Sequence, residues 1–304
     1  MKVVFFGTPQ FAVPFVRHLN ADREIKLEAV VTQPDKPVGR KREMTPPPVK
    51  EFAQKMGIPV FQPEKVKNNK EFIQTIKDLK PEFIVVVAYG AILPKEILEI
   101  PKCDCINVHA SLLPRYRGAS PIQSALLKGD KETGVSFMSM DEKLDAGDIY
   151  LLKKVTIADD DNQESLFEKL SDIGATLLPS VLRDIKDQIL TSIPQYESLV
   201  TYCKKISKDD AQIYPEKETA INIENKLRAF TPWPGIYMIF KGKRLKLIDV
   251  KELETEEKLK AGEFSPIKNK LLLGTKSGIL EIKKIQPEGK KPMSAKEFIN
   301  GFLS

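Results

Sequence analysis

Asn107 and His109 are the residues of this chain best suited to acid–base and electrostatic chemistry. One residue separates them at the end of a short apolar run, and alternate side chains of a strand point to the same face. An Asn amide can donate to a developing oxyanion, and a His ring transfers protons near neutral pH. The chain has two histidines, and the other, His18, has no motif around it. The pair therefore predicts a reaction centre at which charge develops on oxygen.

An acidic loop follows later in the chain and joins two expected strands. Its four acids are Asp141, Glu142, Asp145 and Asp148. A carboxylate in this loop could orient His109, as in other pairs of a base and an orienting group. Turn residues of these types are also common without any catalytic role. Spacing alone does not choose among the four acids.

The first half of the chain alternates short apolar runs with helical stretches. The expected strands are 2–6, 27–32, 83–88, 105–109, 133–140 and 149–155, and the expected helices are 10–20, 47–56, 69–79 and 121–128. The run from Phe83 to Ala88 is apolar throughout, which is typical of a strand buried on both faces. The alternation predicts a doubly wound, mostly parallel, Rossmann-like α/β sheet, with ligands at the carboxyl ends of its strands.

The pattern changes in the last third of the chain. A long helix is expected over 163–189, and residues 190–206 then show little periodicity. One helix near 220–230 precedes short strand candidates at 236–241, 244–251, 270–274 and 278–285, and a last helix is expected from Ser294. We therefore predict a catalytic domain over 1–189, a linker over 190–206, and a smaller, OB-like β-barrel domain over 207–304.

The charge of the chain is uneven. Its 48 Lys and Arg outnumber its 42 Asp and Glu, and most of the excess lies in residues 206–304, with 19 basic against 14 acidic side chains. Basic side chains also gather in residues 36–42, within a long loop after the second expected strand. Such segments are compatible with a polyanion partner, and equally with a lysine-rich solvated surface.

Composition excludes several other classes of protein. The three cysteines do not form a disulfide framework, and two distant histidines give no zinc-ligand spacing, so we expect no metal. The turn after the first strand lacks the G-x-G-x-x-G pattern of dinucleotide-binding proteins. No apolar run is long enough to span a bilayer. A reducing compartment, the cytoplasm, is the expected location.

Two segments together resemble the signature of the folate-dependent formyltransferase family. They are Asn107-x-His109-x-Ser111-Leu112-Leu113-Pro114 and Leu144-Asp145-Ala146-Gly147-Asp148. Further segments are similar to the branch of this family that acts on tRNA, and they lie at 6–12, 32–40, 59–63, 88–94, 206–208 and 230–235. The resemblance covers nearly the whole chain.

The resemblance implies a function and a set of site residues. It selects Asp145 from the four acids and makes Asn107, His109 and Asp145 the catalytic residues. It implies that the formyl donor, 10-formyltetrahydrofolate, is bound by Tyr89, Gly90, Ile92, Ser111, Leu112, Leu113, Pro114, Ala146, Gly147 and Asp148. It implies that the acceptor, initiator methionyl-tRNA, is bound through Arg40, Lys41, Arg42, Lys204, Lys205 and Lys208.

Two other functions are compatible with parts of the sequence. The same reaction could use an amino sugar nucleotide as acceptor, although the tRNA-branch segments and the basic last third argue against it. A dinucleotide- or RNA-binding protein could keep the fold without catalysis, although such a protein would not need Asn107, His109 and Asp145 together. We expect a monomer, because an RNA substrate needs both domains exposed.

Overall fold

The computed structural model describes residues 1–39, 42–267 and 270–303. Its contacts divide the chain into two compact units, and neither is continuous in sequence. Unit 1 contains residues 1–119, 132–156 and 167–203, and unit 2 contains residues 120–131, 157–166 and 204–304. Residues 190–203, which we predicted to be a linker, therefore belong to unit 1.

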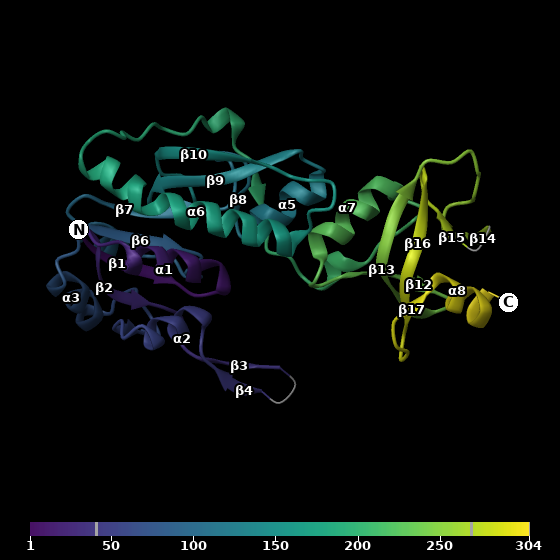
Figure 1. The fold of residues 1–304 in the computed structure, drawn as a ribbon, viewed down its shortest axis with the longest axis horizontal. Helices are drawn as coiled ribbons and strands as arrows, with labels where there is room; N and C mark the ends of the chain where they lie inside the picture. Colours follow the sequence, from purple (N-terminus) through teal and green to yellow (C-terminus); the bar gives the residue numbers. More distant parts are fainter. Residues whose placement is uncertain (40–41, 268–269, 304) are drawn as a thin grey trace. The chain divides into compact units, whose positions relative to one another are not determined.

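Unit 1 is built on a seven-stranded sheet in the order β10-β9-β7-β6-β1-β2-β5 (Figure 1). Its strands are β1 (Lys2–Gly7), β2 (Lys26–Val31), β5 (Val60–Phe61), β6 (Phe83–Val87), β7 (Asp104–His109), β9 (Glu132–Ser139) and β10 (Ile149–Thr156). The neighbouring strands β7, β6, β1, β2 and β5 are parallel to one another, whereas β9 is antiparallel to β7 and β10 is antiparallel to β9. All five residues of β6 are buried, as their apolar run predicts. The mostly parallel α/β sheet is confirmed.

The helices of this region begin where the sequence supplies a proline or a cap. They are α1 (Val13–Ala21), α2 (Pro48–Lys55), α3 (Lys70–Asp78), α4 (Lys95–Leu98) and α6 (Gln163–Lys186), with a 3₁₀ turn, η1 (Gln10–Ala12), before α1. Pro48 occupies the first turn of α2, and the Asn69 side chain accepts from the Phe72 amide to cap α3. Helix α6 lies along the sheet in Figure 1, and its Gly174 lets it pack against Phe15 of α1. These helices cover the buried strands.

The segment that we predicted to be a long basic loop contains a β-hairpin. Strands β3 (Lys36–Val38) and β4 (Glu43–Thr45) pair antiparallel, and all six of their residues are exposed. The hairpin extends away from α2 in Figure 1. Each strand has three residues, and β3 contains Pro37. Strands this short show no recognisable periodic pattern.

Unit 2 contains an antiparallel sheet in the order β12-β13-β16-β15-β14, with β17 paired to β16. The strands are β12 (Ile236–Phe240), β13 (Lys243–Leu253), β14 (Phe264–Ile267), β15 (Lys270–Gly274), β16 (Ile279–Pro287) and β17 (Met293–Ser294). Its helices are α5 (Pro121–Lys128), α7 (Ala220–Phe230) and α8 (Ala295–Phe298), with a 3₁₀ turn, η3 (Asp209–Ala211), and a π-helical turn, η4 (Ile299–Leu303). Ser294 and Glu297 form the predicted capping box of α8. The predicted C-terminal domain with a second sheet is confirmed, and this sheet is antiparallel.

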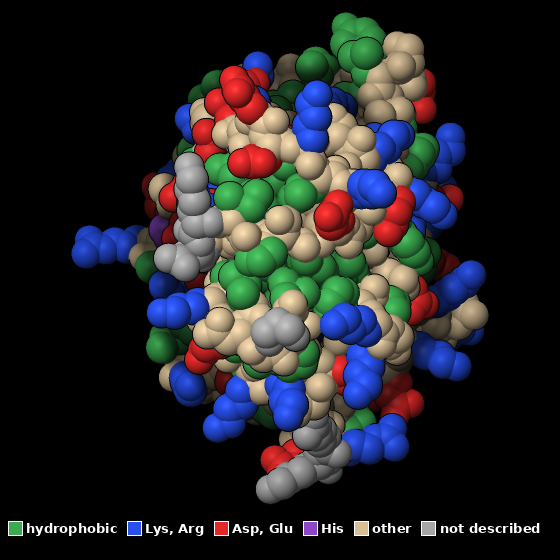
Figure 2. Space-filling model, turned by 90° about the vertical axis from the view of Figure 1, so that its right-hand side faces the viewer, with side chains coloured by type: hydrophobic (Ala, Val, Ile, Leu, Met, Phe, Trp, Pro, Cys, Tyr) green, Lys and Arg blue, Asp and Glu red, His purple; other side chains and the backbone are tan. Residues whose placement is uncertain are grey.

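Basic side chains do not form one block on the face shown in Figure 2. Lys and Arg side chains lie around a group of hydrophobic side chains there, with acidic side chains between them. Among the residues that the structure describes, no helix is long and apolar enough to cross a membrane.

Candidate active site

Strand β7 carries Asn107 and His109 at its carboxyl end. It pairs in parallel with β6, with Val86 opposite Asn107, and antiparallel with β9, with Ser136 opposite His109. Asn107 is half-buried and His109 is 7% exposed. Because they are two positions apart on the strand, both side chains point to the same face of the sheet. The strand thus holds an amide and an imidazole on a rigid support.

The acidic loop between β9 and β10 brings Asp145 to these two side chains. The Asp145 Oδ1 atom accepts a long hydrogen bond of 3.5 Å from Asn107 Nδ2, and Oδ2 lies 3.8 Å from His109 Nδ1. The second distance is that of an ion pair and is too long for a hydrogen bond. A backbone bond of 2.8 Å from the Gly118 amide to Oδ2 fixes the carboxylate. The structure thus brings the three predicted catalytic residues together.

The His109 ring faces an oxygen acceptor at each nitrogen. Its Nε2 atom lies 2.9 Å from the Tyr116 carbonyl oxygen, and its Nδ1 atom faces the Asp145 carboxylate. A carbonyl oxygen cannot donate, so Nε2 must carry a hydrogen for this bond to form. Nδ1 is then the ring nitrogen left for a substrate oxygen, because its 3.8 Å separation from Asp145 is too long for a hydrogen bond. A hydrogen on Nδ1 could be donated to an oxygen that develops negative charge.

The other three acids of the loop have different surroundings. The Asp141 side chain accepts from the Lys143 amide in a local turn, and Glu142 is exposed. Asp148 joins the loop to β9 through its backbone, because its carbonyl accepts from the Ser139 amide. Within the described part of the chain, Asp145 is the acid of this loop that pairs with His109.

Left-handed backbone occurs at three non-glycine residues around this site. The φ angles are +47° at Ala88, +61° at Tyr116 and +49° at Asp145. This conformation costs an L-residue about 1–2 kcal/mol. Residues held in this way cluster at functional sites, where the surrounding structure must maintain them. At Asp145 the conformation directs the carboxylate, and at Tyr116 it directs the carbonyl that His109 contacts.

The residues predicted to bind folate after β6 lie at the same edge of the sheet as His109, because β6 and β7 are parallel. The Tyr89 carbonyl accepts from the Thr8 hydroxyl at 2.7 Å, and burial raises the pKa of the Tyr89 phenol to about 12. Gly90 has a φ of +86°, and Ile92 is 82% exposed. An apolar side chain so exposed at a strand end is compatible with a ligand that covers it.

The other residues predicted to bind folate lie in the loop that follows His109 and in the loop that contains Asp145. The buried Ser111 hydroxyl donates to the Arg115 carbonyl, which stabilises the loop itself. Leu113 is buried against Met138 and Ile149 beneath the site. Half-buried Leu112, Pro114 and Ala146 lie in the same two loops, as does Asp148. Apolar side chains of two loops around a polar centre can hold a planar ligand.

The basic residues predicted to bind tRNA fall into two groups. Arg40 and Lys41 lie outside the described residues, whereas Arg42 is exposed at the start of the chain leading into β4. Lys205 and Lys208 are exposed in unit 2. Lys204 bonds to Asp210 at 2.6 Å and, with Ser207, lowers the pKa of that carboxyl to about 2. Part of its charge is therefore already compensated.

The groups that hold the predicted catalytic side chains were not among the residues predicted from the sequence. The Tyr116 carbonyl and the Gly118 amide act through the backbone, so no side-chain pattern could reveal them. Gln195 was also missed, because it lies in the segment without periodicity. Its side-chain amide donates to the carbonyls of Asp145 and Gly147.

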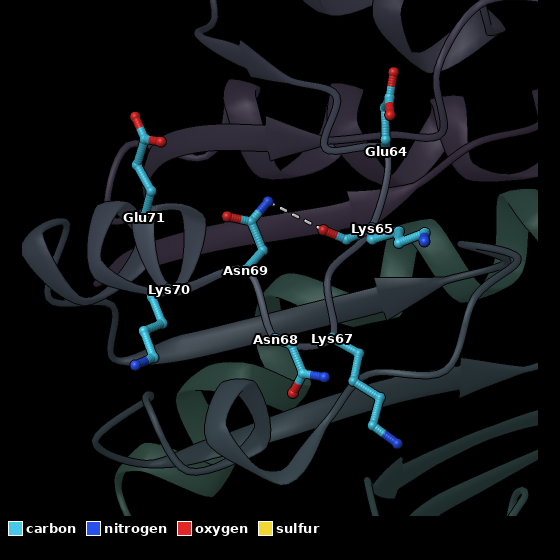
Figure 3. A pocket seen from close by; sticks show the side chains of 7 residues that line it. All are labelled: Glu64, Lys65, Lys67, Asn68, Asn69, Lys70 and Glu71. Carbon is cyan, nitrogen blue, oxygen red and sulfur yellow. Dashed lines mark hydrogen bonds between the residues drawn. The ribbon is translucent and has the colours of Figure 1, made fainter.

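A surface hollow of about 810 Å³ lies elsewhere in unit 1, before and at the start of α3 (Figure 3). It is lined by Glu64, Lys65, Lys67, Asn68, Asn69, Lys70 and Glu71. The Asn69 amide donates to the Lys65 carbonyl, and several of the charged side chains extend outward. Ligand pockets are mostly apolar, so this polar hollow is a poor alternative to the site on β7. Among the described residues, no group of three or more His, Cys, Asp or Glu could hold a metal ion.

Gly147 is required for the acidic loop to close against β9. A Cβ atom added there would lie 1.8 Å from the Ser139 carbonyl oxygen, which belongs to the backbone and cannot turn away. We expect Gly147→Ala to cost about 3 kcal/mol, the upper end for overpacking. This corresponds to a decrease of about 6–12 °C in the midpoint of the thermal transition of unit 1, measured by calorimetry. Glu142→Ala, which changes an exposed side chain of the same loop in unit 1, is the control, and an equal decrease there would contradict the expectation.

Comparison with known proteins identifies the family. Residues 1–182 match the family described as "Formyl transferase", and residues 205–303 match "Formyl transferase, C-terminal domain". The chain belongs to the formyltransferase family. One relative, a methionyl-tRNA formyltransferase from Caldicellulosiruptor saccharolyticus, is 46% identical over 305 residues, which cover 99% of this chain and 97% of the relative.

Solved structures of formyltransferases share the fold at much lower identity. An N-formyltransferase from Helicobacter canadensis in complex with folinic acid and dTDP-3-aminofucose is 18% identical, with a TM-score of 0.67 over 94% of this chain and 99% of that one. HypX from Aquifex aeolicus in complex with tetrahydrofolic acid is 16% identical, with a TM-score of 0.62, and this chain spans about half of its length. These structures establish the formyltransferase fold and not the acceptor.

Proposed function

We propose that this formyltransferase transfers the formyl group of 10-formyltetrahydrofolate to the α-amino group of methionine on initiator methionyl-tRNA. The observation that carries the proposal is the contact of Asn107, His109 and Asp145 at one face of the sheet. The named relative, similar over nearly the full length of both chains, supports the choice of acceptor. An enzyme of translation initiation would work in the cytoplasm, and we propose that it does so as a monomer.

The proposed reaction is the attack of an amine on the formyl carbon. A free α-amino group has a pKa of about 7.7–8.0, so a sizeable fraction is neutral at cellular pH and needs no strong base. Attack gives a tetrahedral intermediate with negative charge on the formyl oxygen. Donors aimed at such an oxygen contribute about 3–4 kcal/mol each to transition-state stabilisation.

Each catalytic residue has a distinct part in this proposal. Asn107 and His109 donate hydrogen bonds to the developing oxyanion. Asp145 balances the charge of the His109 ring and accepts the proton that the attacking amine loses. The proton then passes to the folate nitrogen that leaves. The 3.8 Å separation of His109 Nδ1 and Asp145 is too long for a hydrogen bond, so the Nδ1 hydrogen stays available to the substrate oxygen while the carboxylate still balances the charge of the ring.

We further propose that the two basic regions bind the acceptor. The exposed β3–β4 hairpin would contact the tRNA near the reactive amine, and the domain from residue 207 onward would contact its backbone through exposed lysines. The boundaries 1–189, 190–206 and 207–304 remain our proposal for the domains, although residues 190–203 pack with unit 1.

Replacing Arg42 with alanine tests the hairpin. We expect KM for methionyl-tRNA to rise several-fold and KM for the folate to stay within twofold, because a phosphate contact would be lost. The slope of log affinity against log salt should fall by about one unit. Arg23→Ala, which removes an exposed arginine from a turn after α1, is the matched control. Equal loss of folate and tRNA binding would show that the hairpin does not recognise the acceptor.

An acceptor assay tests the proposed function as a whole. The protein is incubated with 10-formyltetrahydrofolate and with charged initiator tRNA, charged elongator tRNA or an amino sugar nucleotide, and the formylated product is identified. We expect the initiator tRNA to be formylated fastest. Preferential formylation of the amino sugar nucleotide would support the alternative acceptor. Only the shared fold favours that alternative, because the N-formyltransferase that was solved with dTDP-3-aminofucose is just 18% identical to this chain.

A further inference from the structure

The segment 190–203 runs along both loops that carry the candidate site, although its sequence has no regular pattern. Its first contact is a bridge between Ile193 and Ile149, with backbone bonds of 2.8 and 2.9 Å, at the start of β10. Its last contact is the pairing of β11 (Tyr202–Cys203) with β8 (Arg117–Gly118). All of these residues belong to unit 1. The segment therefore connects the acidic loop to the loop that follows His109.

Gln195 lies at the centre of this connection. Its Nε2 atom donates to the Asp145 carbonyl at 2.9 Å and to the Gly147 carbonyl at 2.7 Å. Its Oε1 atom accepts from Arg117 Nε at 3.0 Å. An amide nitrogen has two hydrogens, so both are used on the backbone of the acidic loop, and the oxygen is used on the other side. No other side-chain type of this size supplies two donors and an acceptor in this arrangement.

The same network closes on the Asp145 carboxylate. Arg117 is 2% exposed, and its guanidinium is held between Gln195 and Glu197. The next residue, Gly118, donates its amide to Asp145 Oδ2 at 2.8 Å. Gln195 thus binds the Asp145 backbone directly. Through Arg117 it also contacts β8, whose Gly118 amide binds the Asp145 carboxylate.

The backbone of Asp145 needs such support. Its φ of +49° is unfavourable for a residue with a side chain, and the loop is otherwise exposed from Asp141 to Leu144. A residue released from this conformation would turn its carboxylate away from His109. Conformations of this kind persist only where the surroundings over-determine them.

We propose that Gln195 is a positioning residue for formyl transfer, which holds Asp145 in the conformation that directs its carboxylate to His109. The inference rests on the proposed function, in which Asp145 orients His109 and takes up the proton of the amine. Gln195 does not contact the reacting atoms. It acts through Asp145, and the segment that contains it belongs to the catalytic machinery.

Gln195→Glu tests the proposal in the full-length protein. The substitution keeps the shape and the acceptor for Arg117, and it replaces the two donors with an oxygen that repels the carbonyls of Asp145 and Gly147. We expect kcat for formylation of methionyl-tRNA to fall 10- to 100-fold, with both KM values within threefold. Gln195→Ala, which removes the amide without adding charge, should lose activity in the same direction and keeps the test open if the Glu variant does not fold. Gln74→Glu is the matched control, because Gln74 bonds to Asp78 on the exposed face of α3 in the same unit.

A double-mutant comparison separates positioning from general stability. In an Asp145→Asn background, Gln195→Ala should reduce kcat by less than threefold, because the carboxylate that it positions is already absent. Losses that multiply fully would overturn the proposal, as would wild-type kcat in both Gln195 variants. If the wild type formylates methionyl-tRNA and only Asp145→Asn is impaired, the positioning role fails and the proposed function stands. If the wild type does not formylate methionyl-tRNA, both fail.

Discussion

Alanine in place of His109 is expected to lower kcat for formyl transfer by about 10²–10⁴-fold, the usual contribution of a positioned acid–base group. KM for the folate should change little, because His109 is buried at the end of β7 and the proposed folate contacts lie mainly in the surrounding loops. Steady-state kinetics, with each substrate varied in turn at a saturating concentration of the other, measures kcat and KM for the folate.

The only other histidine of the sequence supplies the control. His18 lies half-buried in the last turn of α1, where a basic side chain has a favourable position at the carboxyl end of a helix. His18→Ala should therefore keep kcat within twofold. Near-wild-type turnover in His109→Ala would rule out the division of labour proposed for the three catalytic residues.

Asp145→Asn is expected to lower kcat by about 10²–10³-fold. Asn can still accept from the Gly118 amide through its oxygen, so the loop should keep its shape. It carries no charge to balance the His109 ring and cannot take up the proton of the attacking amine. Single-turnover rates, measured after the enzyme–folate complex is mixed with methionyl-tRNA, report the chemical step without product release.

Asp141→Asn is the matched control within the same loop. The Asp141 side chain accepts from the Lys143 amide in a turn, and an Asn side chain can make the same bond. Its kcat should stay within twofold of the wild type. If the two variants lost similar activity, the loss would come from disturbance of the loop and not from the charge of Asp145.

The parallel sheet could be predicted because its central strands β1 and β6 contain apolar runs of a length typical of strands. The apolar run from Phe83 predicted β6. The Asn107–His109 pair predicted the polar carboxyl end of β7. The choice of Asp145 could not be made from local spacing, since all four acids occupy turn positions. It came from the resemblance to a family, and the structure now gives a geometric reason, the left-handed Asp145 backbone and the Gly118 amide.

Short elements and backbone contacts could not be predicted in the same way. The β3–β4 hairpin and the β8–β11 pair have strands of two or three residues, too short to show a period of two. Gln195 is polar in an irregular segment, and its importance depends on carbonyls that are 50 and 48 residues away in sequence. Long-range pairing of a side chain with a backbone leaves no local pattern.

The path of residues 190–203 sets a rule for exchanging parts between enzymes of this kind. In a chimera joined at residue 190, the residues equivalent to Gln195 and Thr201 would come from the parent that supplies the second domain. Their partners, the Asp145 carbonyl and the Tyr116 amide, would come from the other parent. Gly118 adds a steric condition, because a Cβ there would lie 2.3 Å from the Cys203 carbonyl oxygen. The second domain should therefore be exchanged after residue 203, so that the sheet of unit 1 keeps the segment 190–203 that packs against its loops.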